Sequence, residues 1–113
     1  MVVLATDVPL DGGQMNRICR RAGAGIARLG AFWGNGSGDI VLGFTTANRI
    51  AHAPEADSAP LQRLGDHRID DLFRAAAETT QESILNALCM ATAVEGREGA
   101  RRPLLSDWLH SAN

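Results

Sequence analysis

Aromatic residues are scarce in this sequence: they make up 4% of its 113 residues, and tyrosine is absent. Surfaces that bind single-stranded RNA use exposed aromatic rings on which bases stack, and the same scarcity argues against a platform for carbohydrates. The formal net charge is small as well, at -2. A chain with so small a net charge has no general attraction to nucleic acid or to an anionic membrane. Composition therefore argues against nucleic acid and membranes as partners.

Cysteine occurs only twice, and Cys19 and Cys89 do not form a CxxC pair. Both lie within apolar helical patterns, which favours buried free thiols over a disulfide or a metal site. The three histidines, His52, His67 and His110, are isolated in the sequence, and none has the helical spacing of a zinc motif. We therefore expect neither a metal nor any other cofactor.

Long hydrophobic runs are missing, so no segment is expected to span a bilayer. The first residues, Met1–Thr6, have no basic stretch before them and reach Asp7 at once, which is not the pattern of a signal peptide. We therefore expect a cytoplasmic protein. The sequence also opens directly in an apparent strand, whereas the ends of domains are usually loose. This feature suggests that the chain is part of something longer.

At 113 residues the chain is expected to form a single α+β domain, residues 1–113. A β-branched apolar run predicts a buried strand over 2–5. Apolar side chains spaced by three, four and seven predict a helix over 14–29, in which two glycines suggest close packing against a sheet. Residues 40–46 predict a second strand, apolar on both faces and therefore covered on both sides. So few elements cannot cover two such strands, which indicates a missing partner.

A segment with two prolines, residues 52–66, is predicted to be a loop or lid. Residues 69–92 predict a long helix, and a last short helix is predicted over 104–110, docked through Trp108. The buried stripe of the long helix is expected to contain Phe73, Ala76, Ala77, Thr80, Ile84, Ala87, Leu88 and Ala91.

The most distinctive stretch is Gly34-Asn35-Gly36-Ser37-Gly38-Asp39, which leads directly into the second predicted strand. Glycine loses the most backbone freedom on folding, so three glycines before a strand carry a large cost in conformational entropy. In extended backbone, residues two apart project to the same side, which would bring Ser37 and Asp39 together. A hydroxyl beside a carboxylate suits proton handling. The alternative is a turn in which both side chains bond local backbone N–H groups, and the six residues alone favour the turn.

Several common motifs are absent. The glycine stretch has neither the Lys-Ser/Thr ending of a P-loop nor the GxGxxG spacing of a dinucleotide-binding fold. Ser37 is followed by Gly38-Asp39 and a strand, so it does not form the GxSxG elbow of a hydrolase. The short basic cluster Arg101-Arg102-Pro103 is too small for a nucleic-acid site.

Three motifs together resemble the DmpA-type L-aminopeptidase/D-esterase family, which includes the β-peptidyl aminopeptidases and is peptidase family S58. Met1–Leu10 resembles the start of the family's β-subunit. Gly34–Ile40 followed by Phe44–Asn48 resembles its inner strand motif, and Thr79–Leu88 resembles its late helix. The resemblance covers nearly the whole chain and is weakest over the predicted loop.

The resemblance implies a precursor that cuts itself ahead of a serine, which then becomes the N-terminal nucleophile of the β-subunit. It also implies a four-layer αββα sandwich built from α- and β-subunits, with several α/β pairs in an oligomer. Ser37 would orient the nucleophile or relay its proton. Asp39, where many members carry Glu, would polarise that proton and hold an amino group. Asn35 and Gly36 would contact a short peptide, amino-acid amide or ester.

The same resemblance places the nucleophilic serine just upstream of Met1, outside this chain, together with the α-subunit. We therefore expect the chain alone to lack peptidase activity. Two rivals remain: an acyltransferase like ornithine acetyltransferase, with a threonine nucleophile, and a non-catalytic binding or assembly protein that keeps the fold. The DNA upstream of the Met1 codon would discriminate the peptidase from the non-catalytic protein, since an in-frame serine supports the peptidase and an in-frame stop supports the non-catalytic protein.

Overall fold

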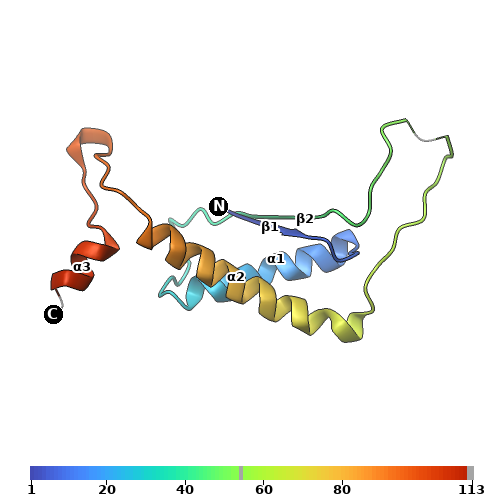
Figure 1. The fold of residues 1–113 in the computed structure, drawn as a ribbon, viewed down its shortest axis with the longest axis horizontal. Helices are drawn as coiled ribbons and strands as arrows, with labels where there is room; N and C mark the ends of the chain where they lie inside the picture. The colour runs from blue at the N-terminus through green and yellow to red at the C-terminus, as the bar shows by residue number, and fades with distance from the viewer. Residues whose placement is uncertain (54, 112–113) are drawn as a thin grey trace. The chain divides into compact units, whose positions relative to one another are not determined.

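A computed structural model describes residues 1–53 and 55–111, so Pro54, one of the two prolines in the predicted loop, lies outside the described residues. The chain separates into two compact units, Met1–Gln81 and Glu82–Asn113. The first unit contains two strands and two helices (Figure 1). In chain order these elements are β1 (Val2–Thr6), α1 (Gly12–Ala27), β2 (Val41–Thr45), a short 3-10 helix (Asp66–Arg68) and α2 (Ile69–Cys89), whose last turns belong to the second unit. The predicted α+β class is confirmed.

The two strands form a parallel sheet. Val2 lies opposite Val41 and Thr6 lies opposite Thr45, so the register is fixed along the whole of both strands. Parallel neighbours need a crossover, and α1 provides it between β1 and β2. Both strands fall within a residue or two of their predicted positions.

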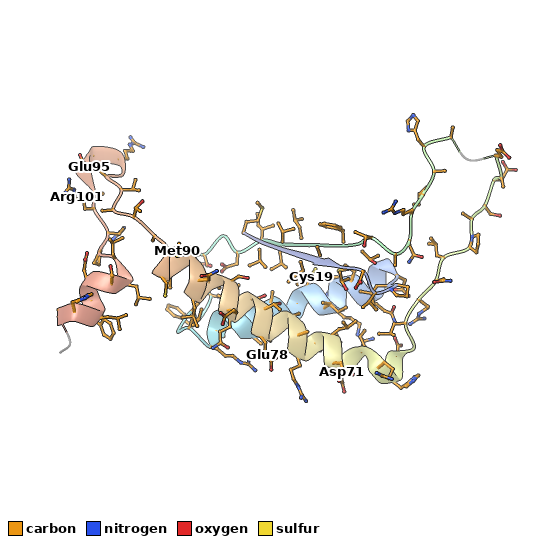
Figure 2. The ribbon with its side chains drawn as sticks, in the orientation of Figure 1. Cys19, Asp71, Glu78, Met90, Glu95 and Arg101 are labelled. Carbon is orange, nitrogen blue, oxygen red and sulfur yellow. The ribbon has the colours of Figure 1, made fainter. Side chains whose placement is uncertain are left out.

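One face of the sheet is covered and the other is open. Gly43 packs so closely on α1 that a Cβ at this position would collide with the sulfur atoms of Met15 and Cys19. Cys19 lies on α1 beneath the strands (Figure 2). On the opposite face Leu42 and Phe44 are 53% and 51% exposed. The prediction that β2 is covered on both sides is therefore wrong for the described chain, because α1 and the first part of α2 lie on the same side of the strands (Figure 1).

A capping box sets the start of α1. The Asp11 side chain accepts a hydrogen bond from the Gln14 backbone N–H at 2.8 Å, and the Gln14 side chain reaches back to the Asp11 N–H. This reciprocal arrangement satisfies donors at the helix end, so the helix begins at Gly12, two residues earlier than predicted. It also ends two residues early, at Ala27.

Gly23 and Gly25, the two glycines within the predicted helix, make close contacts, but not with the sheet as predicted. A Cβ on Gly25 would collide with the backbone oxygen of Ala77 on α2 and would lie 2.9 Å from the Thr80 Cβ. A Cβ on Gly23 would collide with the Trp33 ring. Gly25 therefore permits a close approach of α1 and α2. Ala22, another small residue on α1, is fully buried.

The predicted loop is confirmed, since the described residues between Thr45 and Asp66 form no helix or strand. Asn48 closes its two ends: the side-chain amide donates to the Gln62 carbonyl at 2.8 Å and accepts from the Gln62 N–H at 3.0 Å. Gln14, only 2% exposed, donates to the Leu64 carbonyl at 2.7 Å. The loop is thus tied to the start of α1, although its described residues between Ala51 and Leu61 are exposed.

Asp66 should make the stability of this unit depend on pH. The hydrogen bond from the Gln14 amide, and also the charge of Arg63 at 2.9 Å, hold the pKa of the Asp66 carboxyl below its ordinary 3.8. A lowered pKa stabilises the fold above the ordinary value, and this stabilisation is lost as the pH falls through the folded pKa. We expect Asp66→Asn to lower the melting temperature at about pH 6, and this deficit to be smaller near about pH 3. Thermal melts across this range would measure it. Asp57→Asn, in the exposed loop, is the control, and an equal deficit at both pH values would contradict the assignment.

The second unit contains the end of α2, a 3-10 turn (Arg97–Gly99) and α3 (Leu105–Ser111). The long helix ends at Cys89, three residues before its predicted end. Three members of its predicted buried stripe are exposed, namely Ala87, Leu88 and Ala91, and Trp108 is 63% exposed rather than docked. These predictions are wrong for the described residues, because apolar spacing identifies a face without supplying what covers it.

The prediction of two buried thiols is wrong for Cys89, which is exposed, while Cys19 is half-buried. Burial raises the pKa of the Cys19 thiol. No helix in the described part of the chain is both long and apolar enough to cross a membrane.

Candidate active site

The glycine stretch folds as a tight turn followed by an extended entry into β2. The Ser37 N–H donates to the Gly34 carbonyl at 2.8 Å, which makes Asn35 and Gly36 the two central residues of a β-turn. Both residues are exposed, as are Ser37 and Asp39. All four predicted site residues therefore lie on one accessible segment.

Ser37 and Asp39 meet as their spacing predicts. The Ser37 hydroxyl donates a short hydrogen bond to the Asp39 Oδ2. Among the described residues the two side chains bond each other and not a neighbouring backbone N–H group, so the backbone forms a turn without using either side chain. The geometry of the pair is confirmed, and its catalytic role stays a prediction.

The pair lies beside the beginning of β1. The Val2 N–H donates to the Ile40 carbonyl at 2.9 Å, and Val2 is opposite Val41 in the register. Continuing this register places Met1 level with Ile40, and a residue before Met1 would be level with Asp39. Paired strands lie about 4.8 Å apart, so such a residue would be a close neighbour of the Ser37–Asp39 pair.

Two glycines of the glycine stretch, Gly36 and Gly38, have no structural explanation within the described chain. A Cβ on Gly36 or Gly38 would have nothing within 4 Å, and neither residue has a positive φ. Backbone conformation and packing would thus tolerate a side chain at both positions. Their small size leaves open space next to Ser37 and Asp39, as a bound molecule or a further part of the protein would require.

Trp33 anchors the turn to α1 and was not identified from the sequence. Its ring occupies the space that a Cβ on Gly23 would need. Its φ of 55° is unusual for a residue other than glycine, so surrounding contacts must hold it there. Neighbouring Phe32 is 89% exposed and makes no such anchor. The pair of adjacent aromatic residues, Phe32 and Trp33, in a sequence poor in aromatics is the signal from which this anchor could have been predicted.

The described residues contain no group of three or more His, Cys, Asp or Glu side chains that could hold a metal ion. What the site offers is a carboxylate that accepts from a hydroxyl, at an exposed strand entrance. This pair can orient a hydroxyl or an amino group and pass a proton.

Comparison with known proteins identifies the family. Residues 1–102 match the model of peptidase family S58. The chain belongs to peptidase family S58. This family consists of serine aminopeptidases, so the resemblance seen in the sequence motifs is confirmed.

Individual relatives agree with the family match. The chain is 35% identical over 99 residues to a β-peptidyl aminopeptidase, BapA, of Sphingosinicella microcystinivorans, covering 88% of this chain and 25% of that protein. The solved structure of the PH0078 protein from Pyrococcus horikoshii OT3 is 42% identical, with a TM-score of 0.86, over 96% of this chain and 31% of that one.

A third relative has a described chemistry and fold. The L-aminopeptidase D-Ala-esterase/amidase of Ochrobactrum anthropi is described as a prototype for the serine aminopeptidases and a variant of the Ntn hydrolase fold. It is 37% identical, with a TM-score of 0.77, over 86% of this chain and 27% of that one. This S58 chain therefore spans only about a quarter to a third of the length of the relatives it matches.

Proposed function

We propose that this S58 chain is the β-subunit portion of an autoprocessed aminopeptidase with an N-terminal serine nucleophile. The observation that supports it best is the Ser37–Asp39 hydrogen bond, placed level with the residue that would precede Met1. The names of the relatives, a β-peptidyl aminopeptidase and an L-aminopeptidase D-Ala-esterase/amidase, point to hydrolysis after an N-terminal residue. The substrates would be short peptides, amino-acid amides or esters.

The reaction would proceed through an acyl-enzyme. The oxygen of a serine just upstream of Met1 attacks the carbonyl carbon of the substrate, and its proton passes to the free amine of that serine or to a nearby polar group. The proton is then given to the leaving amine or alcohol, and water later hydrolyses the acyl-serine. Ser37 orients the attacking hydroxyl or relays its proton. Asp39 polarises Ser37 and holds an amino group, while Asn35 and Gly36 border the substrate.

The remaining portion of the relatives' length would complete the molecule as an α-subunit. The open face of the sheet, where Val3, Leu42 and Phe44 are each more than half exposed, is apolar and suited to packing against a second sheet. Such packing would create the four-layer αββα sandwich, and several α/β pairs would assemble into an oligomer. The isolated chain should have no turnover of β-alanyl or D-alanyl p-nitroanilide, because it carries no serine at the attack position.

A chimera tests this proposal. This chain replaces the segment that it matches in the Ochrobactrum anthropi enzyme, so that the host supplies everything else. We expect the chimera to cleave itself into two chains, visible by mass spectrometry, and to hydrolyse D-alanyl p-nitroanilide. The host enzyme is the positive control. A chimera that melts cooperatively and has the oligomeric size of the host, yet neither cleaves itself nor turns over substrate, would overturn the proposal in favour of a non-catalytic role.

A further inference from the structure

We propose that a shallow hollow between the end of α1 and the segment before the glycine turn binds the leaving end of the substrate. The ligand is an aliphatic C-terminal residue with its free carboxylate: Arg20 pairs with the carboxylate, and Phe32 and Trp33 contact the aliphatic side chain. This inference rests on the proposed function, since it takes the chain to be part of an aminopeptidase. It goes further in naming a subsite and the class of leaving group that the subsite selects.

The hollow has the size of a ligand site and a mainly apolar lining. Its volume is about 410 Å³, and small-molecule sites commonly have about 300–1,000 Å³. Small residues of α1 line it, among them Ala24 and Ala27, and Phe32 and Trp33 line it from the segment that follows the helix. Arg20 is the one charged residue among the described residues that line it. The hollow therefore suits an apolar group that carries a negative charge.

Arg20 differs from the other arginines of α1, a helix with three arginines and no acidic residue. Arg17 lies 3.8 Å from the Asp66 carboxylate. The Arg21 guanidinium lies over the Phe73 ring, 4.2 Å from its centre. Arg20 is exposed and makes neither kind of contact within the described part of the chain. Because a guanidinium presents a planar fork of N–H donors that matches a carboxylate, Arg20 is available to bind one.

Both aromatic rings are exposed, and glycines decide where they lie. Phe32 is almost fully exposed and Trp33 is about half exposed. The Trp33 ring occupies the space that a Cβ on Gly23 would need, and a Cβ on Gly34 would lie 3.2 Å from the Phe32 ring. Exposed rings placed in this way offer a large apolar contact area to a ligand.

The hollow lies within reach of the Ser37–Asp39 pair. Trp33 directly precedes the β-turn from Gly34 to Ser37. Since the ends of a β-turn are less than about 7 Å apart, the Cα atoms of Trp33 and Ser37 are at most about 11 Å apart. Three residues of extended peptide span about 10 Å. A tripeptide whose first residue is held at the pair can therefore place its third residue in the hollow.

Charge gives the substrate its direction. In the proposed reaction Asp39 holds the amino end of the substrate, so an arginine on the far side of the turn suits the opposite end. A short peptide ends in a carboxylate, and the part that leaves after hydrolysis retains it. An aliphatic last side chain gains free energy by leaving water for the aromatic rings, whereas a charged one does not. The favoured leaving group is thus an aliphatic residue with a free carboxylate.

Binding to the full chain tests the hollow without any turnover. The probe is N-acetyl-leucine, and its neutral counterpart is N-acetyl-leucinamide. We expect millimolar N-acetyl-leucine to shift the NMR signal of the Trp33 indole N–H, whereas the Trp108 indole, in the second unit, is the internal control and stays in place. The amide should bind about 10-fold more weakly, because it lacks the charge that pairs with Arg20. If the isolated chain is not folded, the same spectra are recorded on the chimera, where Trp33→Phe identifies the signal.

Two pairs of variants separate charge from space. Arg20→Gln should lower the affinity for N-acetyl-leucine by about 10-fold, to that of the amide. Arg74→Gln, at an exposed arginine of α2, is its matched control and should bind like the parent. Ala24→Phe fills the hollow and should abolish binding of both probes. Ala87→Phe, at an exposed alanine of α2, should not.

Kinetics of the chimera test the subsite in the reaction. The substrates are D-alanyl-glycyl-leucine and its C-terminal amide. We expect kcat/KM to favour the free acid by about 10-fold, mainly through KM, because the carboxylate contact is made in the ground state and the transition state alike. Arg20→Gln should remove this preference, and Arg74→Gln should retain it.

An active chimera without a preference for the free acid would overturn this inference and leave the proposed function intact. Equal binding of the two probes, or equal losses in Arg20→Gln and Arg74→Gln, would also overturn it. A Trp33 signal that no probe shifts, in a chain with the size of a dimer, would assign the hollow to a second copy and contradict the proposed ligand. Charge-dependent binding by a folded but inactive chimera would support the carboxylate site while overturning the proposed function.

Discussion

Replacing Asp39 by Asn in the chimera should lower the turnover of D-alanyl p-nitroanilide by about 100- to 10,000-fold, the usual range for a group that handles a proton in the transition state. The carboxylate accepts the Ser37 hydroxyl hydrogen and so sets the direction in which Ser37 can donate or accept. An amide in its place keeps a polar contact but loses the negative charge. Initial rates over a range of substrate concentrations would separate an effect on kcat from one on KM.

Two further substitutions separate charge from hydrogen bonding. Ser37→Ala should also reduce kcat, because the relay oxygen is lost while the carboxylate remains. Asp39→Glu should retain most of the activity, because it keeps a carboxylate within one methylene of the same place. Rescue by Glu but not by Asn would show that the charge is needed.

The matched control is another Asp and Ser pair in the same chain. Asp57→Asn and Ser58→Ala alter the same residue types in the exposed loop, away from the strand entrance, and should leave kcat unchanged. Isolated chains carrying Ser37→Ala or Asp39→Asn should melt like the parent, because both side chains are exposed. Full activity of Asp39→Asn would remove Asp39 from the proposed site.

Gly25→Ala should destabilise the first unit by about 1–3 kcal/mol, the usual range for overpacking. In an exposed helix interior the same change stabilises by up to about 1 kcal/mol, because alanine restricts the unfolded chain and favours the helix. Here the new methyl would collide with the Ala77 carbonyl oxygen and approach the Thr80 Cβ to 2.9 Å. Backbone of a neighbouring helix cannot turn aside as a flexible side chain can, so α1 and α2 must separate.

Urea unfolding followed by circular dichroism would measure this loss. Gly12→Ala is the control, because a Cβ at Gly12 would have nothing within 4 Å and the residue lies in the same helix. The control should be neutral or slightly stabilising. If both variants unfold at the same urea concentration as the parent, the helices do not approach as closely as Gly25 indicates.

The local elements were predictable from the sequence, because apolar spacing reflects the geometry of each element. Both strands and both long helices appear close to their predicted places, with errors of at most three residues at their ends. The error at the start of α1 came from the Asp11–Gln14 capping box, which a reading of apolar periodicity alone does not detect. The meeting of Ser37 with Asp39 was predictable too, since it depends only on residues two apart.

By itself the sequence determined the fold class and the family, and it gave the pairing of Ser37 with Asp39 as one of two arrangements, because each depends on neighbouring residues or on motifs in order. Only the tertiary structure decided the rest: that the pair lies beside the beginning of β1, that Gly25 receives α2, and that one sheet face and the edge of β1 are open. The physical reason is that these features depend on contacts between segments far apart in the chain. Periodicity shows which side of an element is apolar, whereas the partner that covers it is chosen by packing in three dimensions.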